Sequence, residues 1–440
     1  MDLFCLAIIL LRLSLVTSVN FTQVFEWPDG LDYEWPSEAK RTRALKYGTS
    51  DPEKIVPLFM AVFGTRIFLS LEKYNVGIPV TLVSLPTSSK KSSAPPKLTP
   101  FPSWDIHKKY GDCNNIDRAT GLEVDSVGRL WVLDDGGFRC NSKQWIFDLS
   151  NNDHTILIHH FHFCYDMHNL VLDETPNGYF AYIARWGEPH IVVFSLERED
   201  SSILYTPGMN VFSIALSPKE EARQLYLSRY NSTELYSIPI PENPHETQTV
   251  NPKLTRNWKA RPYRILMDNH GTMYAAFLWE NHIISWNTDQ PYQEQHFHEA
   301  GKLDMSWPFA FALDSLGTFW VTVFNNTGNK PSFRLLKAAV GAKPYTSDSP
   351  TTQVGRFTGK GQTDKSTNSA LIGSLAFLLV LSCFIVIWLS LRMKKSIIYK
   401  EQCNGVAMEM AAIRNSVSLY EEVDEGIENA LYRLFTAPPP

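Results

Sequence analysis

Five residues that could bind a small molecule stand at the beginning of strands that recur along the chain. Phe212, Tyr263 and Phe309 could stack on a planar aromatic ligand. Thr120 and Asn169 could hydrogen-bond hydroxyl groups on that ligand, and an amine on it would need an acidic or aromatic partner. The alternative is that all five only fill the interior of the fold. We treat them as candidate ligand-binding residues.

No motif identifies a catalytic residue. The chain has no Gly-x-Ser-x-Gly elbow and no zincin pattern. His168, Glu123 and Arg264 could transfer a proton to or from a bound ring, but no pattern singles out one of them. The residues alone therefore leave enzymatic activity open, and we predict no cofactor.

Two groups of alternating residues have the spacing of metal ligands. His160, His162 and Cys164 would share one face of a strand, and His296 and His298 form a second pair. The alternative is that they occupy polar positions on solvent-exposed outer strands. We favour this alternative and predict no metal site.

The elements that must position these residues belong to a sixfold repeat. Each copy consists of an apolar strand, a tight turn and a second strand whose central residues are aromatic or apolar. Asp or Asn in the turn tolerates the tight bend, and the following Gly takes a positive φ. The clearest copies are 122–132, 265–275 and 311–321, and the looser ones are 58–68, 170–180 and 214–227. Their second-strand aromatics are Phe68, Trp131, Phe180, Tyr226, Tyr274 and Trp320.

A third strand follows each copy, which makes every repeat a small antiparallel sheet. These third strands are expected at 78–83, 144–149, 190–195, 234–238, 282–286 and 332–336. Six such sheets bury their faces by stacking around an axis, so the repeat predicts an all-β, six-bladed β-propeller. Residues 20–27 could add a strand to the last blade and close the ring. A β-sandwich is the alternative, which the near-constant period disfavours.

The two ends of the chain predict a membrane protein. The apolar run at 3–11 and the small residues at 16–18 indicate a signal peptide at 1–18. Residues 370–391 carry no charge, and as a helix about 33 Å long they could cross a bilayer. Arg392, Lys394 and Lys395 follow directly, which places the C-terminal side in the cytoplasm. We predict a single-pass type I protein of the cell membrane with an extracellular propeller.

This topology divides the chain into further segments. The propeller is expected at 19–344, a flexible stalk at 345–369, a transmembrane helix at 370–391 and a disordered cytoplasmic tail at 392–440. Sequons at Asn20, Asn231 and Asn325 indicate a glycoprotein. In the tail, Tyr420 and Tyr432 each precede a bulky apolar residue by three positions, so they could recruit cytoplasmic adaptors.

Charge and cysteine content bear on two further questions, nucleic-acid binding and disulfide pairing. The net charge of -5, without a basic stripe, gives no case for nucleic-acid binding. Cys113, Cys140 and Cys164 are the cysteines expected outside the cell, which leaves one pair and one further thiol unless chains cross-link. Spacing does not fix the connectivity, and we predict Cys140 paired with Cys164.

Several stretches of the chain resemble the yellow / major royal jelly protein family. They occur in the family's order from about residue 21 to residue 340. The stretches are 25–27, 31–37, 77–82, 98–104, 111–113, 128–134, 215–218, 283–288 and 305–314. The resemblance implies a six-bladed propeller with an extracellular role in pigmentation, development or small-molecule capture. Some members are reported to convert dopachrome in melanin formation, and salivary members bind biogenic amines.

The resemblance also draws attention to Phe324 and Asn325, which follow the last repeat about where amine-binding relatives carry ligand contacts. A glycosylated Asn325 cannot line a closed pocket, so glycosylation and ligand contact exclude each other there. We favour glycosylation of Asn325 and keep Phe324 as a ligand candidate. The chain departs from the family in its predicted membrane span. It also has Ser126 and Val127 where a Cys is usual, so the family's disulfides cannot be copied.

Three functions are consistent with these features. The first is a surface-tethered propeller that binds a small aromatic ligand, a catechol or a biogenic amine, with a role in pigmentation or development. The second is a dopachrome-converting enzyme of melanin synthesis, whose isomerisation needs only a general acid and base near the ring. The third is a cell-surface adhesion or signalling protein.

Overall fold

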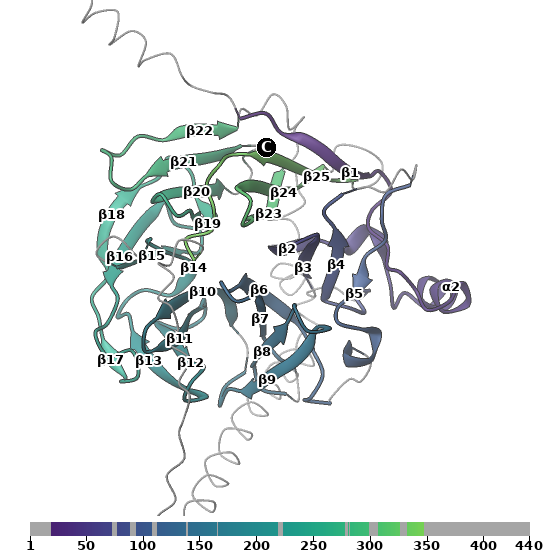
Figure 1. The fold of residues 1–440 in the computed structure, drawn as a ribbon, viewed down its shortest axis with the longest axis horizontal. Coiled ribbons are helices and arrows are strands. Elements are labelled where there is room, and N and C mark those ends of the chain that lie inside the picture. Colours follow the sequence, from purple (N-terminus) through teal and green to yellow (C-terminus); the bar gives the residue numbers. More distant parts are fainter. Residues whose placement is uncertain are drawn as a thin grey trace, which may run out of the picture. The chain divides into compact units, whose positions relative to one another are not determined.

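The computed structural model describes residues 19–346 apart from 73–76, 89–93, 108–111, 138–139, 165, 219–222, 278–279, 281, 299–306 and 326–331. Six sheets stand around a central axis, and all but one of their described strand pairs are antiparallel (Figure 1). The described core consists of six apolar clusters, one between each pair of neighbouring blades. The predicted six-bladed propeller is therefore confirmed.

The strands of the first three blades run as follows from the axis outward. Blade 1 is β2 (Pro57–Phe63), β3 (Arg66–Leu71), β4 (Leu82–Pro86) and β5 (Thr99–Pro100). Blade 2 is β6 (Ala119–Val124), β7 (Arg129–Asp134), β8 (Lys143–Asp148) and β9 (His154–His160). Blade 3 is β10 (Met167–Thr175), β11 (Gly178–Arg185), β12 (His190–Ser195), β13 (Asp200–Tyr205) and β17 (Gln248–Thr249).

The other three blades follow the same plan. Blade 4 is β14 (Val211–Leu216), β15 (Gln224–Arg229), β16 (Glu234–Pro239) and β18 (Lys253–Asn257). Blade 5 is β19 (Pro262–Met267), β20 (Thr272–Phe277), β21 (Ile283–Asn287) and β22 (Gln295–His298). Blade 6 is β23 (Trp307–Leu313), β24 (Thr318–Asn325), β25 (Ser332–Ala339) and β1 (Thr22–Trp27).

The ring is closed by the N-terminal strand. β1 pairs antiparallel with β25, with Thr22 opposite Lys337 and Trp27 opposite Phe333. Phe25 and Trp27 are buried in the apolar cluster between blades 6 and 1. The prediction that residues 20–27 complete the last blade is therefore confirmed.

An aspartate explains why the repeat is visible in the sequence. In blade 6, Asp314 Oδ1 accepts hydrogen bonds from the backbone N–H groups of Leu316 and Thr318, and Oδ2 accepts from Trp320 Nε1 at 2.8 Å. Gly317 in the same turn has φ +79°, a conformation that favours glycine. Asp125 with Trp131 and Asp268 with Tyr274 repeat the contact. One side chain thus sets the turn and anchors the aromatic residue six positions later.

The third strand of blade 1 differs from the prediction. Residues 78–83 were expected there, but β4 begins at Leu82, and Phe68 of β3 lies opposite Ser84. Pro79 has no N–H to donate to a ladder, and Gly77 before it has φ +111°. Ile78 and Val80 are instead buried in a loop of the core.

All six innermost strands contain a β-bulge in their first half. The pairing register of each one with its neighbour shifts near its start, in β2, β6, β10, β14, β19 and β23. A bulge leaves a residue outside the ladder and redirects its side chain. Each innermost strand therefore has a residue outside the ladder near its start.

Beyond β25 the chain turns inward and crosses one mouth of the central channel. We call residues 341–346 the strap. Asn269 N donates to Lys343 O at 2.9 Å, and Lys343 N donates to Asn269 Oδ1 at 2.8 Å. Tyr345 is buried against the cluster between blades 3 and 4. Tyr345 and Thr346, predicted as the start of a flexible stalk, are therefore part of the propeller.

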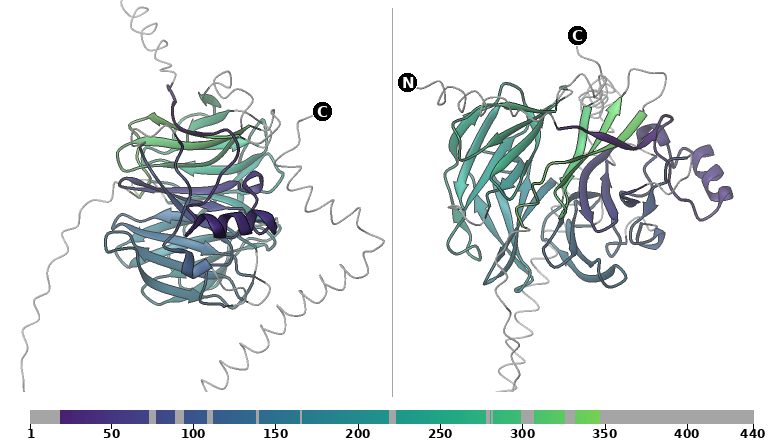
Figure 2. Two further views of the ribbon diagram at one scale, coloured as in Figure 1. Left: turned by 90° about the vertical axis from the view of Figure 1, so that its right-hand side faces the viewer. Right: turned by 45° about the horizontal axis from the view of Figure 1, so that its top comes forward.

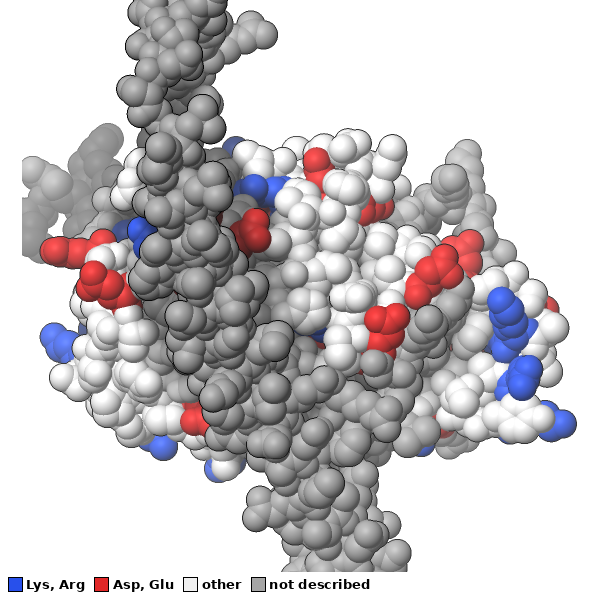
Figure 3. Space-filling view, turned by 90° about the horizontal axis from the view of Figure 1, so that it is seen from below, with Lys and Arg blue, Asp and Glu red and all other residues white. Residues whose placement is uncertain are grey.

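The described residues also form two short 3₁₀ helices and one α-helix. They are η1 (Pro52–Lys54), η2 (Trp104–His107) and α2 (Glu38–Lys46), and α2 lies outside blade 1 (Figures 1 and 2). α2 carries four basic residues, and basic side chains gather at this edge of the molecule in Figure 3. Elsewhere on the face that Figure 3 shows, acidic and basic groups are mixed.

Several predicted segments lie outside the described residues. They are the signal peptide at 1–18, most of the stalk, the span at 370–391 and the tail with Tyr420 and Tyr432. Within the described part of the chain, no helix has the length and apolar character needed to cross a bilayer.

Candidate functional site

A cavity of about 310 Å³ lies at the end of the channel that the strap crosses. Its walls are formed by four innermost strands from about their middle onward, by the turns that follow two of them, and by the strap. The lining residues are Met60, Ala61, Val62, Phe63, Glu123, Val124, Asp125, Ser126, Arg264, Leu266, Ala312, Leu313, Ser315, Lys343, Pro344, Tyr345 and Thr346. Blades 1, 2, 5 and 6 therefore supply the cavity.

The strap fills the side of the channel that belongs to blades 3 and 4. The Tyr345 hydroxyl accepts a hydrogen bond from the backbone N–H of Leu172 in β10 at 2.8 Å. Burial raises the pKa of Tyr345 well above its usual value, so this hydroxyl stays neutral. The strap thus shapes the cavity as well as closing the mouth.

Arg264 is the buried cation of the cavity wall. Its Nη2 donates to the carbonyl of Phe311 at 3.1 Å, and its guanidinium lies 4.4 Å from the ring centre of Phe59 and 5.1 Å from that of Phe311. Burial lowers the pKa of Arg264 to about 10, against the opposing field of Glu123, so it remains charged at neutral pH. The side chain is held between two aromatic rings.

Glu123 is the half-buried carboxyl of the same wall. Desolvation raises the pKa of Glu123 to about 8, although the charge of Arg264 opposes the shift. The carboxyl is therefore mostly protonated at pH 7 and can donate a hydrogen bond or a proton. A neutral acid beside a cation, in an otherwise largely apolar cavity, suits a small ring that carries oxygen substituents.

In the opposite half of the channel, aromatic rings pack against one another. His168 stacks on Phe212 with ring centres 4.0 Å apart, and it meets Phe59 edge-on at 5.1 Å. Phe212 in turn contacts Tyr230 at 5.1 Å. Desolvation lowers the pKa of His168 to about 3, with a further contribution from Arg264, so the imidazole is neutral at pH 7. This half is packed core.

The five candidates that begin the innermost strands share one structural position, the β-bulge. Thr120, Asn169, Phe212, Tyr263 and Phe309 all fall within the register shifts. The sequence repeat therefore identified structurally equivalent residues. In the fold, these residues lie in the same half of the channel. Of the four whose side chains the structure describes, Thr120, Asn169, Phe212 and Tyr263, none lines the cavity at the other half.

Asn169 shows what a bulge residue does. Its Oδ1 accepts hydrogen bonds from Ile214 N at 2.8 Å and from Ser213 Oγ at 3.2 Å, both in blade 4. Ser213 Oγ accepts in turn from Ile265 N of blade 5 at 3.1 Å. These side chains satisfy backbone N–H groups of the neighbouring innermost strands. Asn169 therefore links blade 3 to blade 4 by hydrogen bonds.

The other candidates differ in their surroundings. Phe324 lies in β24, buried in the cluster between blades 6 and 1 and 4.9 Å from the Phe333 ring. Tyr263 packs against the cluster between blades 5 and 6. The side chains of Phe309 and Asn325 lie outside the described residues. Of the other sequons, Asn20 and Asn231 are exposed.

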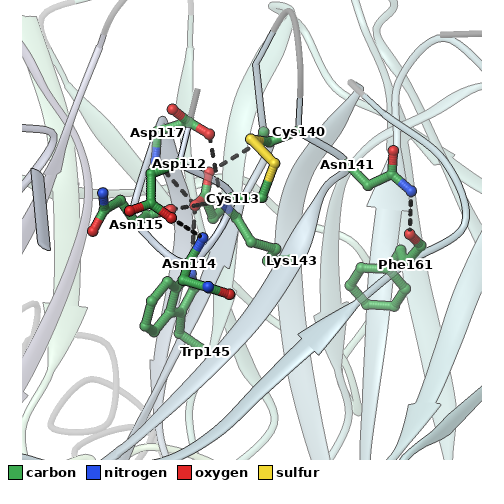
Figure 4. The surroundings of a disulfide bond; sticks show 12 residues. Asp112, Cys113, Asn114, Asn115, Asp117, Cys140, Asn141, Lys143, Trp145 and Phe161 are labelled. Carbon is green, nitrogen blue, oxygen red and sulfur yellow. Dashed lines mark hydrogen bonds and ion pairs between the residues drawn. A yellow bond between two sulfur atoms is a disulfide. The ribbon is translucent and has the colours of Figure 1, made fainter. Parts of the chain in front are cut away.

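The disulfide differs from the predicted one. Cys140 bonds to Cys113, with Cα atoms 5.1 Å apart, so the predicted Cys140–Cys164 pair is wrong (Figure 4). Cys140 sits in a turn closed by mutual backbone hydrogen bonds with Gly137, which holds it beside the segment before β6. The number of residues between cysteines does not reveal this approach.

The histidine pattern does not form a metal site in the described part of the chain. No group of three or more His, Cys, Asp or Glu residues there could hold a metal ion. The side chains of His296 and His298 are not described.

Comparison with known proteins accounts for this architecture. The family model for major royal jelly protein matches residues 200–321. Protein yellow of Drosophila melanogaster is 32% identical over 350 residues, covering 68% of this chain and 63% of that protein. Protein yellow of Drosophila pseudoobscura pseudoobscura is 31% identical over 379 residues, covering 72% and 66%. The chain belongs to the yellow / major royal jelly protein family.

A further relative of this yellow-family chain bears an enzyme's name. Dopaminechrome tautomerase of Drosophila melanogaster is 22% identical over 342 residues, covering 66% of this chain and 73% of that protein. The chain spans less than two thirds of the length of several yellow proteins that it matches. A solved virginiamycin B lyase from Staphylococcus aureus aligns at 12% identity with a TM-score of 0.42, covering 73% of this chain and 89% of that one.

Sequence reasoning named Glu123 and Arg264 but could not rank them, and it missed the strap. The available signal was an ionisable residue inside an apolar strand, Glu123 in Leu-Glu-Val and Arg264 in Tyr-Arg-Ile. The contribution of Tyr345 had no such signal, because nothing in its neighbourhood predicts that the chain returns to the axis.

Proposed function

We propose that this yellow-family chain is a cell-surface propeller whose channel cavity binds a small aromatic ligand, with a role in pigmentation or development. The observation that carries the proposal is the cavity beside Arg264 and Glu123. Its size suits one or two fused rings, and its polar groups suit hydroxyl or carbonyl substituents. The membrane tether at 370–391, the signal peptide and the sugars on Asn20, Asn231 and Asn325 are parts of the same proposal.

The decisive experiment measures binding and turnover side by side. The full chain, purified in detergent, is titrated calorimetrically with catechols and indoles, including dopamine and serotonin, and is tested in a dopachrome-decay assay. Heat without turnover supports the binder. Absence of both signals would reject the small-molecule proposal and favour adhesion or signalling through a protein partner.

The proposed location has its own test. Antibodies against the propeller should label intact cells, and removal of N-linked sugars should lower the apparent mass. Loss of surface labelling on deletion of 370–391 is the expected result. Retention of the protein at the surface after that deletion would overturn the tether.

A second function, dopachrome isomerisation, is favoured by Glu123 and by the similarity to dopaminechrome tautomerase. An acid with a pKa of about 8 is near the value at which proton transfer at neutral pH is effective. In this isomerisation two protons leave carbons of the five-membered ring and two protons join the two quinone oxygens, so no redox partner is needed. Glu123→Gln should then lower the turnover rate by about 100-fold or more. An unchanged rate would reject Glu123 as the acid or base.

A further inference from the structure

The buried charge of Arg264 has no counter-ion among the residues that the structure describes. Its residue exposure is 7%, yet it forms no ion pair within the described chain. Nη2 donates to the Phe311 carbonyl, whereas Nε and Nη1 have no acceptor there. A buried charge without a counter-ion is costly, and an anionic ligand in the adjoining cavity would offset that cost.

Two aromatic rings fix the position of the Arg264 side chain. The rings of Phe59 and Phe311 flank the guanidinium, and Phe59 is itself packed against His168. Arg264 therefore cannot turn toward solvent without breaking two aromatic contacts. Its planar fork is pre-organised for an oxygen anion.

The carboxylates near Arg264 do not neutralise it. Asp125 lines the cavity, but its Oδ1 accepts from Val127 N and Arg129 N, and its Oδ2 accepts from Trp131 Nε1 and Arg129 Nε. Glu123 is half-buried and mostly protonated at pH 7, because desolvation raises its pKa to about 8. Lys343 of the strap adds a second cation to the lining.

We infer that Arg264 determines the ligand specificity of the cavity, and that the ligand is a planar aromatic compound bearing an ionised oxygen group, a carboxylate above all. Aromatic acids bind in preference to the corresponding amines. This inference rests on the proposed function, and it is the opposite of the amine preference that the family resemblance implies. The ligand carboxylate pairs with the guanidinium charge that no described carboxylate neutralises.

Matched ligand pairs test the inference on the unmodified full chain. Calorimetry with 3,4-dihydroxyphenylacetate against dopamine, and with indole-3-acetate against tryptamine, changes the charged group while keeping the ring. We expect each acid to bind at least about tenfold more tightly than its amine, the factor that one charge-assisted hydrogen bond can supply.

Variants then assign the preference to Arg264. Arg264→Gln should weaken acid binding at least about tenfold and change amine binding by less than about threefold, while Arg264→Lys should retain part of the preference. Arg256→Gln, which removes an exposed arginine from the outermost strand β18, is the matched control and should change neither. Thermal unfolding establishes that each variant is folded.

The outcomes separate the two proposals. Equal or tighter binding of the amines overturns the inference and leaves the proposed function standing. A preference for acids that survives in folded Arg264→Gln also overturns it, because another group is then responsible. Failure of all four compounds to bind rejects the proposed function itself. If Arg264→Gln does not fold, the ligand pairs on the unmodified chain and the Arg264→Lys variant still decide the question.

Discussion

The two halves of the central channel are built from the same six strands but differ in kind. In the first halves, His168 and Phe212 stack at bulged positions, and Phe212 also contacts Tyr230 after β15. Farther along the strands, from about their middle, a cavity lined by Glu123 and Arg264 lies beneath the strap. Aromatic residues at equivalent repeat positions therefore indicate packing here, whereas the charged residues interrupting apolar strands mark the candidate site. Four experiments test this contrast.

The largest expected effect is that of removing the strap's anchor. Tyr345→Ala deletes a buried ring and its hydrogen bond to Leu172 N, so the free energy of unfolding should fall by about 3–5 kcal/mol. Ligand affinity should fall as well, because one wall of the cavity is lost. Chemical denaturation and calorimetry measure the two effects. Tyr345→Phe is the control, with an expected cost of about 1 kcal/mol.

Removing a ring from the packed half should affect stability alone. Phe212→Ala deletes a ring that stacks on His168, and it should cost about 3 kcal/mol of unfolding free energy. Ligand affinity of the folded variant should stay within about threefold of the original. A loss of binding without a loss of stability would show that the packed half contacts the ligand.

The two halves should respond to pH in opposite directions. The raised pKa of Glu123 favours the protonated folded state, so its contribution to stability is present below about pH 4.5 and is lost as pH rises to about 8. The lowered pKa of His168 favours the neutral folded state, so its contribution is present above pH 6.5 and is lost as pH falls toward about 3.

Unfolding midpoints measured from pH 4 to 9 test this opposition. Glu123→Gln should flatten the decline between about pH 4.5 and 8, and His168→Gln should flatten the decline on the acid side. Identical pH profiles for the original chain and Glu123→Gln would mean that the carboxyl is not desolvated.

The smallest effect is expected at Thr120. Its hydroxyl is buried and has no hydrogen-bond partner among the described residues. Thr120→Val keeps the shape and removes the unsatisfied group, so stability should be unchanged or rise by less than about 1 kcal/mol. Ligand affinity should not change, and a clear drop in calorimetry would return Thr120 to the binding site.

The sequence predicts the ring better than it predicts the site, and the reason is physical. Asp314, Gly317 and Trp320 form a local device, so the turn and its aromatic anchor can be recognised within seven residues. The cavity depends on contacts between distant segments, such as Tyr345 with Leu172. Bulges add a second difficulty, since Asn169 and Phe212 leave the alternation that would place them from the pattern.

The order of synthesis gives the ring closure a further consequence. Thr22 and Lys337 are hydrogen-bonded although they are 315 positions apart, so β1 leaves the ribosome long before its partner β25 exists. At translation rates of 5–20 residues per second, the delay is roughly 15 to 60 s. During that time Phe25 and Trp27 lack the blade 6 strands that complete their buried cluster, so a chaperone that shields apolar segments would help most at this stage.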